Sequence, residues 1–264
     1  MLIVVSPAKT LDYETPLPAF VTPTQPHYIS EASELIDVLK SKPPAEIASL
    51  MSLSDKLASL NVLRYNDWQP SFSSPDARPA LFAFKGDVYT GLDVSRFSAD
   101  DLKQAQEHLR ILSGLYGLLR PLDYMRPYRL EMGTDLANPR GKNLYEFWGD
   151  RLTEAVNAAM AEQGDKVLIN LASQEYFRAI QPKKLNGRLI TPQFRDEKNG
   201  QFKIISFFAK KARGRMAAWL IQERISTPEA LLDYSVDGYR YDAGLSRSDA
   251  PVFTRREADK GMDA

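Results

Sequence analysis

The sequence predicts a single domain of mixed α/β structure, and three observations lead to this fold class. Two short apolar runs that stop at turn residues, Leu2–Val5 and Val167–Asn170, are typical of buried strands. Several longer segments carry apolar residues at helical spacing behind a capping residue. Two apolar runs flank a polar segment at residues 196–200, which predicts an antiparallel hairpin. Because strands and helices alternate along the chain, we expect residues 1–248 to form one domain.

The first 67 residues predict a strand, a loop and three helices. Leu2–Val5 is the strand, and it opens into a loop at Ser6–Pro7. Four prolines mark residues 14–28 as a second loop. Helical patterns then begin at Ser30, Pro43–Pro44 and Ser54.

The middle of the chain predicts one more strand and a long helix. Residues 80–84 read as a strand that ends at Lys85–Gly86. Ser98 is a good helix cap, and an apolar stripe continues from it as far as Leu112. We therefore expect this helix to end near Ser113–Gly114.

The second half predicts a helix at 143–163 that stops at Gly164, and then the strand Val167–Asn170. The hairpin consists of Leu189–Phe194 and Phe202–Phe207, with a five-residue polar loop between them. A helix at 208–224 follows directly. The last segment, 249–264, is polar, and we expect it to fray as a tail.

Composition excludes several kinds of chemistry. The chain has no Cys, which removes disulfides, thiolate metal sites and cysteine nucleophiles. It has two His, at positions 27 and 108, so a histidine-rich metal site is excluded, and we expect neither a metal nor a cofactor. No apolar run approaches the ~20 residues that span a bilayer. The short apolar start does not resemble a signal peptide. We expect a cytoplasmic protein with no membrane partner.

The charge is unevenly distributed although the formal net charge is zero. Residues 178–215 contain eleven Lys or Arg and two acidic residues, a local excess of nine positive charges. The densest part includes Lys210, Lys211 and Arg213 at the start of the predicted 208–224 helix, where basic groups and free amides favour phosphate. Such a segment indicates an anionic partner, most plausibly nucleic acid, or else a solvated surface.

A second nucleic-acid signal is Ser113-Gly114-Leu115-Tyr116-Gly117, directly after the helix predicted from Ser98. Paired glycines let a hairpin turn tightly and expose its amides, as in helix-hairpin-helix proteins that grip DNA phosphates. Arg120 and Arg129 follow among tyrosines, a mixture that suits stacking on unpaired bases. A helix end followed by an ordinary loop explains the same glycines.

Polar residues at predicted strand ends suggest a different function. Lys9 follows the first strand, Lys85, Asp87 and Tyr89 follow the strand at 80–84, and Asn170 and Ser173 follow or close the strand at 167–170. Sites of α/β sheets usually lie at such ends. Asp87 could act as a general base and Lys9 or Lys85 as an electrophilic partner, with Tyr89 as a further catalytic candidate. This pattern favours an enzyme that acts on nucleic acid or nucleotide.

Six motifs together resemble the YaaA family of bacterial peroxide-stress-response proteins, and the resemblance runs from Met1 to about Tyr241. The motifs are Ser6–Asp12, Ala83–Leu92, Leu112–Asp123, Tyr128–Gly133, Ile169–Ser173 and Phe207–Gly214. The resemblance implies a cytosolic protein of hydrogen peroxide defence that binds DNA and is associated with lowering unincorporated iron. It also implies an unusual α/β fold with a basic cleft and a helix-hairpin-helix element, and it brings no established enzyme activity.

By motif match, the implied hairpin falls on Ser113 through Gly117, and charge and motif position extend the DNA-binding prediction to the basic residues. The predicted DNA-binding residues are Lys9, Lys85, Ser113, Gly114, Tyr116, Gly117, Arg120, Arg129, Lys210, Lys211 and Arg213. We expect little sequence preference. Direct iron storage would need His, Cys or clustered carboxylates, whereas this chain has no Cys and two isolated His. We therefore expect the implied effect on iron to be indirect, through DNA or another protein.

Overall fold

The computed structural model describes residues 1–261, and its centre is a five-stranded sheet in the order β6-β5-β1-β8-β9. The predicted N-terminal strand is β1, and it pairs in parallel with β5 on one side and with β8 on the other. β9 continues the parallel part beside β8, and β6 closes the other edge antiparallel to β5. The bounds are β1 Leu2–Val5, β5 Leu109–Ser113, β6 Gly117–Leu119, β8 Val167–Leu171 and β9 Arg188–Ile190.

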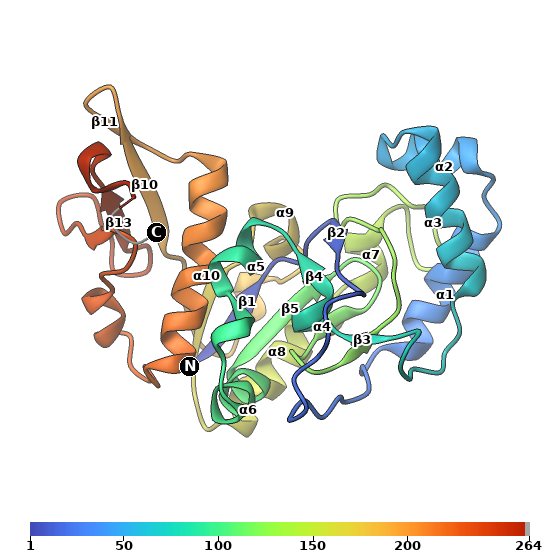
Figure 1. The fold of residues 1–264 in the computed structure, drawn as a ribbon, viewed down its shortest axis with the longest axis horizontal. Coiled ribbons are helices and arrows are strands. Elements are labelled where there is room, and N and C mark those ends of the chain that lie inside the picture. Colours follow the sequence, from blue (N-terminus) through green and yellow to red (C-terminus); the bar gives the residue numbers. More distant parts are fainter. Residues whose placement is uncertain (262–264) are drawn as a thin grey trace.

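A second, four-stranded sheet has the order β11-β10-β13-β12 and lies at the left of Figure 1. Two two-stranded ribbons, β2 with β4 and β3 with β7, complete the strands. The bounds are β10 Gln193–Lys198, β11 Gln201–Lys203, β12 Arg240–Tyr241, β13 Val252–Arg255, β2 Thr10–Leu11, β4 Phe84–Lys85, β3 Arg78–Pro79 and β7 Tyr124–Met125.

Helix α10 packs between the two sheets, and α1 to α3 form a separate group at the opposite end of the molecule (Figure 1). The α-helices are α1 Ile29–Lys40, α2 Pro44–Met51, α3 Asp55–Asp67, α4 Ala80–Ala83, α5 Asp87–Leu92, α6 Ala99–His108, α7 Leu144–Trp148, α8 Arg151–Glu162, α9 Gln174–Phe177 and α10 Ser206–Gln222. Short 3-10 helices occupy Val94–Arg96, Pro182–Lys184, Ala230–Asp233 and Glu257–Asp259. Within residues 1–261, no helix is both long enough and apolar enough to cross a bilayer.

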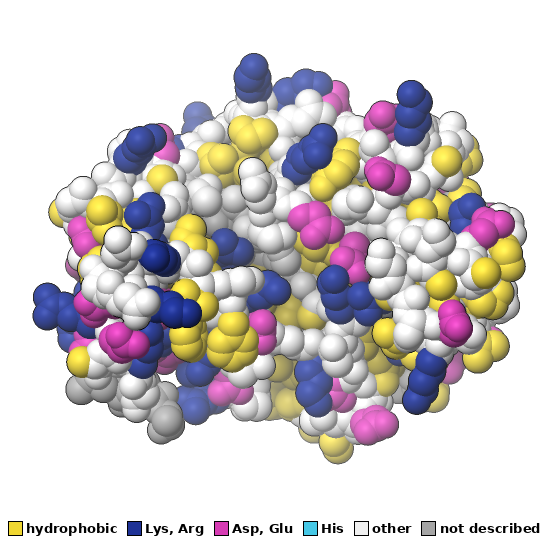
Figure 2. All heavy atoms as spheres, turned by 90° about the horizontal axis from the view of Figure 1, so that it is seen from above, with side chains coloured by type: hydrophobic (Ala, Val, Ile, Leu, Met, Phe, Trp, Pro, Cys, Tyr) yellow, Lys and Arg dark blue, Asp and Glu magenta, His cyan; other side chains and the backbone are white. Residues whose placement is uncertain are grey.

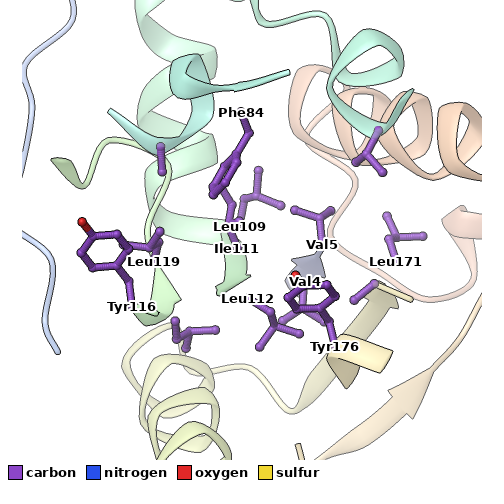
Figure 3. Close-up of a cluster of buried hydrophobic side chains, with 14 of the residues drawn as sticks. Val4, Val5, Phe84, Leu109, Ile111, Leu112, Tyr116, Leu119, Leu171 and Tyr176 are labelled. Carbon is purple, nitrogen blue, oxygen red and sulfur yellow. The ribbon is translucent and has the colours of Figure 1, made fainter. Parts of the chain in front are cut away.

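The core around the first sheet explains why its strands are apolar on both faces. Val4 and Val5 of β1 are fully buried, as are Ile111 of β5 and Leu171 of β8. Figure 3 shows these side chains gathered around the centre of the sheet. A parallel sheet covered on both faces needs this continuous apolar pattern, which is why the two short apolar runs were recognisable as strands.

Two glycines let α5 and α10 approach more closely than any other side chain would allow. A Cβ at Gly214 would lie 1.7 Å from the carbonyl oxygen of Val88, and one at Gly91 would lie 2.0 Å from that of Lys211. Both contacts are with backbone, which cannot swing aside. The beginnings of both helices, which carry Asp87 and Lys210, are therefore held at one end of the first sheet.

Two predicted elements are wrong. The helix predicted to run from Ser98 to Ser113–Gly114 ends at His108, and Leu109–Ser113 is strand β5. Its apolar residues are buried from every side in the sheet, and a continuous apolar run does not distinguish a helix from a buried strand. The strand predicted at residues 80–84 is mostly helix α4, with Phe84 alone entering β4.

The predicted antiparallel hairpin is confirmed, but its turn is shorter than expected and its second strand ends at Lys203, so that Ser206 and Phe207 belong to α10. β10 and β11 pair antiparallel, and the turn consists of Asn199 and Gly200, both with positive φ as in a type I′ turn. Leu189 and Ile190 belong to β9 of the other sheet. The polar residue Asp196, expected in the loop, lies inside β10 and is fully buried.

The tail expected to fray at 249–264 contains an ordered strand. Val252–Arg255 is β13, which lies between β10 and β12, and Val252 and Phe253 are buried. The polar composition misled the prediction because four residues suffice for a strand inside a sheet. The last three residues, 262–264, lie outside the described part of the chain.

One further helical prediction changes in detail, and three others are confirmed. The helix predicted at 143–163 is two helices, α7 and α8, separated at Gly149, whose φ is +51°. Consecutive helices joined by a short turn occur at α2 and α3, where Ser52 is left-handed and the Ser54 side chain accepts from the Leu57 amide. The helices predicted from Ser30, Pro43–Pro44 and Ser54 are confirmed as α1, α2 and α3.

Candidate functional site

A cleft of about 470 Å³ opens at the carboxyl ends of β1 and β8. Within this sheet, β5 lies on one side of β1 and β8 lies on the other, so the strand order reverses at β1. Ligands of open α/β sheets bind at such a switch point. We call this cavity the strand-end cleft; Figure 2 looks onto this end of the molecule and shows Lys, Arg, Asp and Glu side chains around a hollowed surface.

Residues from five separate segments line the strand-end cleft. It contains four of the predicted cations, three carboxylates and two serines, as well as loop backbone. The polar lining residues are Ser6, Lys9, Thr10, Lys85, Asp87, Glu131, Ser173, Glu175, Lys210 and Arg213.

Two serines join the ends of the two central strands. Ser6 Oγ accepts a hydrogen bond from the Ser173 amide at 2.8 Å and donates to Ser173 Oγ at 3.3 Å. Ser173 also caps α9 by accepting from the Tyr176 amide. These hydrogen bonds join the two strand ends at the floor of the cleft, so both hydroxyl groups have a structural role.

Two of the four cations have acidic partners. Lys9 Nζ lies 2.8 Å from Glu131, and Glu131 also accepts from Arg129 at 3.1 Å, so this carboxylate is shared between two bases. Lys85 lies 3.8 Å from Asp12. Arg129 lies beside the cleft rather than in its lining, and its Nε is buried without a hydrogen-bond partner within residues 1–261.

The two cations of α10 differ from these. Within residues 1–261, no carboxylate lies within ion-pair distance of Lys210 or Arg213. Lys210 is exposed, whereas Arg213 is half-buried, and this desolvation lowers the pKa of its guanidinium. A half-buried cation that faces a cleft without a partner favours an anionic ligand. Lys211 is half-buried on α10 and does not line the cleft.

Of the residues predicted to take part in catalysis, Asp87 lines the cleft, whereas Tyr89 and Asn170 are buried next to it. Asp87 lines the cleft at the first turn of α5, where a helix dipole also favours an acid. Tyr89 does not line it: its buried hydroxyl donates to the Ser6 carbonyl at 3.1 Å, and burial raises the pKa of Tyr89 well above 10. Asn170 is buried in β8 and accepts from the Ala172 amide. Tyr89 and Asn170 therefore support the cleft from within.

The helix-hairpin-helix element predicted at Ser113–Gly117 is wrong. Ser113–Gly117 connects β5 to β6 as a β-hairpin rather than two helices. Ser113 Oγ lies 2.6 Å from the Tyr128 hydroxyl, and the Tyr116 hydroxyl accepts from Trp68 Nε1 at 2.9 Å. All of these side chains are buried, so the turn offers no amides to a phosphate. Gly114 is required because a Cβ would lie 2.3 Å from the Leu130 carbonyl oxygen.

Arg120 lies away from the strand-end cleft. Its guanidinium pairs with Asp123 at 2.9 Å and lines a different cavity of about 720 Å³, which is bordered by α8. Within the 178–215 segment, several basic residues form ion pairs away from the cleft: Lys184 with Asp150, Arg188 with Asp249 and Arg215 with Asp237. The positive excess of this segment is therefore dispersed, and of its eleven bases only Lys210 and Arg213 reach the cleft.

The Asp12 carboxylate beside the cleft gives a pH prediction. Hydrogen bonds from the Thr15 amide and hydroxyl lower the pKa of Asp12 to about 2 from an ordinary 3.8. A depressed carboxylate stabilises the fold above the unfolded-state pKa, and this contribution is lost as the pH falls through the folded-state value. In urea titrations, the stability gap between wild type and Asp12→Asn should be constant above pH 5 and close between about pH 4 and 2. A gap that does not change with pH would contradict this.

Glu131 and Glu175 were missed by the sequence reasoning. Glu131 lies within the Tyr128–Gly133 motif, whereas Glu175 has no local signal and enters the cleft because α9 follows Ser173. Within residues 1–261, no three His, Cys, Asp or Glu side chains form a group that could hold a metal ion.

The comparison with known families agrees with the motifs that line this cleft. A family model described as peroxide stress protein YaaA matches residues 1–245. Ser6–Asp12, Ala83–Leu92 and Phe207–Gly214 supply most of the cleft's polar residues and lie within that match. Since the match covers all but the last residues of the 264, this chain belongs to the peroxide stress protein YaaA family.

Proposed function

We propose that this peroxide stress protein binds DNA through phosphate contacts at the strand-end cleft, with little sequence preference. The observation that carries the proposal is that Lys210 and Arg213 of α10, which have no acidic partner among residues 1–261, line a cleft that also holds Lys9 and Lys85. Contacts to phosphate position a protein on DNA without reading its sequence. Bound along the duplex, the protein would shield DNA during peroxide stress.

The charge of the cleft supports a phosphate rather than a cation. Of the three carboxylates in the lining, Glu131 is shared by Lys9 and Arg129, Glu175 accepts from the Gly133 amide at 3.0 Å, and Asp87 lies in the first turn of α5. Lys85 faces Asp12, which lies outside the lining. The cations of α10 then remain to meet a ligand. A phosphodiester accepts hydrogen bonds from both an ammonium and a guanidinium, and guanidinium suits phosphate geometry especially well.

Binding to a duplex should weaken steeply with salt, because each neutralised phosphate releases counterions. Lys210→Ala/Arg213→Ala should lower the affinity about tenfold or more at low salt. It should also reduce the slope of log K against log salt by about 2. Fluorescence anisotropy with a labelled duplex at several salt concentrations measures both.

The matched control is Lys103→Ala/Lys198→Ala, which removes the same charge from exposed positions outside the cleft. It should leave the salt slope nearly unchanged. Equal effects of the two double variants would mean that binding follows net charge alone, and salt-independent binding would contradict the proposal.

A second function is favoured by one observation: Asp87 lies in the same cleft as Lys9 and Lys85. A carboxylate beside two ammonium groups could act as a general base on a phosphate-containing substrate held by the lysines. Incubation with duplex, bubble-containing and damaged DNA or with nucleotides would yield a product that Asp87→Asn abolishes. Unchanged substrate in every form would exclude this function.

The effect on unincorporated iron is, in this proposal, indirect and runs through DNA or a partner protein. We place the protein in the cytoplasm, where its DNA ligand lies. The supporting feature is the donor set of the cleft, which combines ammonium, guanidinium and carboxylate groups and suits phosphate better than iron.

A further inference from the structure

A second cavity lies beside the strand-end cleft and differs from it in chemistry. Its volume is about 310 Å³, and most of its wall is apolar. We call it the side pocket. Its apolar and aromatic lining comprises Pro16, Pro18, Leu81, Phe82, Phe84, Tyr89, Leu92 and Val94, and its polar lining comprises Asp12, Thr15, Arg78, Thr90 and Ser95.

The two cavities meet at Lys85 and Gly86, which line both. Thr10 and Lys85 are paired in the β2–β4 ribbon, with Thr10 in the cleft lining, and Asp12, just past β2, lines the side pocket. A ligand that crosses this junction would therefore have one part among the cations of the cleft and another against the apolar wall.

Hydrogen bonds made by the polar lining residues hold the wall of the side pocket in place. Arg78 is buried and donates from Nε to the Phe82 carbonyl at 3.0 Å and from Nη2 to the Thr15 carbonyl at 2.6 Å. Asp12 accepts from the Thr15 amide and hydroxyl. These bonds fix the loop at 12–16 against α4, so the pocket is formed before any ligand arrives.

Aromatic rings give this wall a preference for flat ligands. Phe84 and Tyr89 are buried behind this wall and pack against each other with ring centroids 5.4 Å apart, and the half-buried Phe82 offers the most accessible aromatic surface. Nucleobases stack on such rings whatever their sequence. Both cavities have volumes near the lower end of the range for small-molecule sites, about 300–1,000 Å³. A duplex can offer the cleft only its backbone phosphates, because its bases stay stacked inside the helix, so a base enters the side pocket only from a free nucleotide or an unpaired position.

We propose that the strand-end cleft and the side pocket form one composite site for a single nucleotide unit. The phosphate lies among Lys85, Lys210 and Arg213, and the base lies in the side pocket across the Lys85–Gly86 junction. The same chemistry fits a free nucleotide or a base extruded from a DNA strand. The inference rests on the proposed function only in taking the cleft as a phosphate site.

The test measures how much a base adds to the binding of a phosphate. The free probes are 2-deoxyribose 5-phosphate and deoxyadenosine monophosphate. The strand probes are a 12-nucleotide single strand and the same strand with one central abasic position. Stacking on aromatic side chains predicts a base-dependent gain of about 5- to 150-fold in at least one pair of probes.

Thr90→Trp should abolish this gain without altering the phosphate-only probes. Thr90 is an exposed residue at the rim of the side pocket and is absent from the cleft lining, so a large side chain there blocks the pocket without disturbing the core. Thr90→Ser is the matched control and should retain the gain. Lys210→Ala/Arg213→Ala should weaken both members of each pair equally.

The outcomes separate this inference from the proposed function. A gain in the free pair alone identifies a free nucleotide as the ligand, and a gain in the strand pair alone identifies an extruded base. No gain in either pair, or a gain that Thr90→Trp leaves intact, overturns the composite site even if duplex binding remains salt-dependent. Conversely, a gain with deoxyadenosine monophosphate in a protein that binds no DNA retains the site and removes the proposed function.

Discussion

Replacing Asp196 with alanine should lower the free energy of unfolding by about 3–5 kcal/mol, because it leaves a buried arginine without its counter-charge. Asp196 is fully buried in β10, and Arg255 of β13 donates to its Oδ1 from Nη2 at 2.7 Å and from Nε at 2.8 Å. The other carboxylate oxygen accepts from the Tyr239 hydroxyl at 2.6 Å. Urea unfolding at neutral pH measures the loss directly.

An exposed ion pair supplies the control for this prediction. Arg188 and Asp249 also lie 2.9 Å apart but are largely in solvent, so Asp249→Ala should cost about 0–1 kcal/mol. The guanidinium of Arg255 also lies 4.4 Å from the centre of the Tyr239 ring and 4.8 Å from that of Phe208, which keeps it in place once its partner is removed. Similar losses for both variants would show that Asp196 and Arg255 remain hydrated in solution.

Replacing Gly214 with alanine should lower the free energy of unfolding by about 2–4 kcal/mol, even though alanine is the better helix former. The added methyl group would sit 1.7 Å from the Val88 carbonyl oxygen, so α5 and α10 must separate. Because Asp87 and Lys210 lie on these helices, the separation would also widen the strand-end cleft. We therefore expect weaker duplex binding together with the lower unfolding midpoint.

Gly244→Ala is the corresponding control. A Cβ there would meet nothing closer than 3.4 Å, and the residue lies in a loop away from the cleft. It should change the unfolding midpoint very little. If Gly214→Ala matched it in both stability and binding, the close approach of α5 and α10 would not be what positions the cleft.

Local patterns were sufficient where one element carries its own signal. β1 and β8 are short apolar runs, and α10 follows a hairpin whose turn, Asn199–Gly200, has the residues that positive φ values require. The family resemblance was equally recoverable, because its motifs are contiguous. These features depend on neighbours in sequence, and a single chain displays them.

The remaining features depend on contacts between residues far apart in sequence, and the local sequence pattern does not reveal such contacts. Leu109–Ser113 has the apolar content of a helix end, and only its position beside β1 makes it a strand. Asp196 reads as a loop residue until Arg255 is placed beside it. The basic residues of the cleft come from segments far apart in sequence, and their meeting depends on the order of the strands and on the contact between Gly91 and Gly214.

The position of β13 in the middle of the second sheet has a consequence for synthesis on the ribosome. Arg255 follows Asp196 by 59 residues, which at about 5–20 residues per second means a delay of about 3–12 s. During that interval β10 has an open edge and an unmatched acid, and unpaired strand edges invite aggregation. The length of this exposure therefore depends on how fast residues 197–255 are synthesised, and stress that slows translation would prolong it.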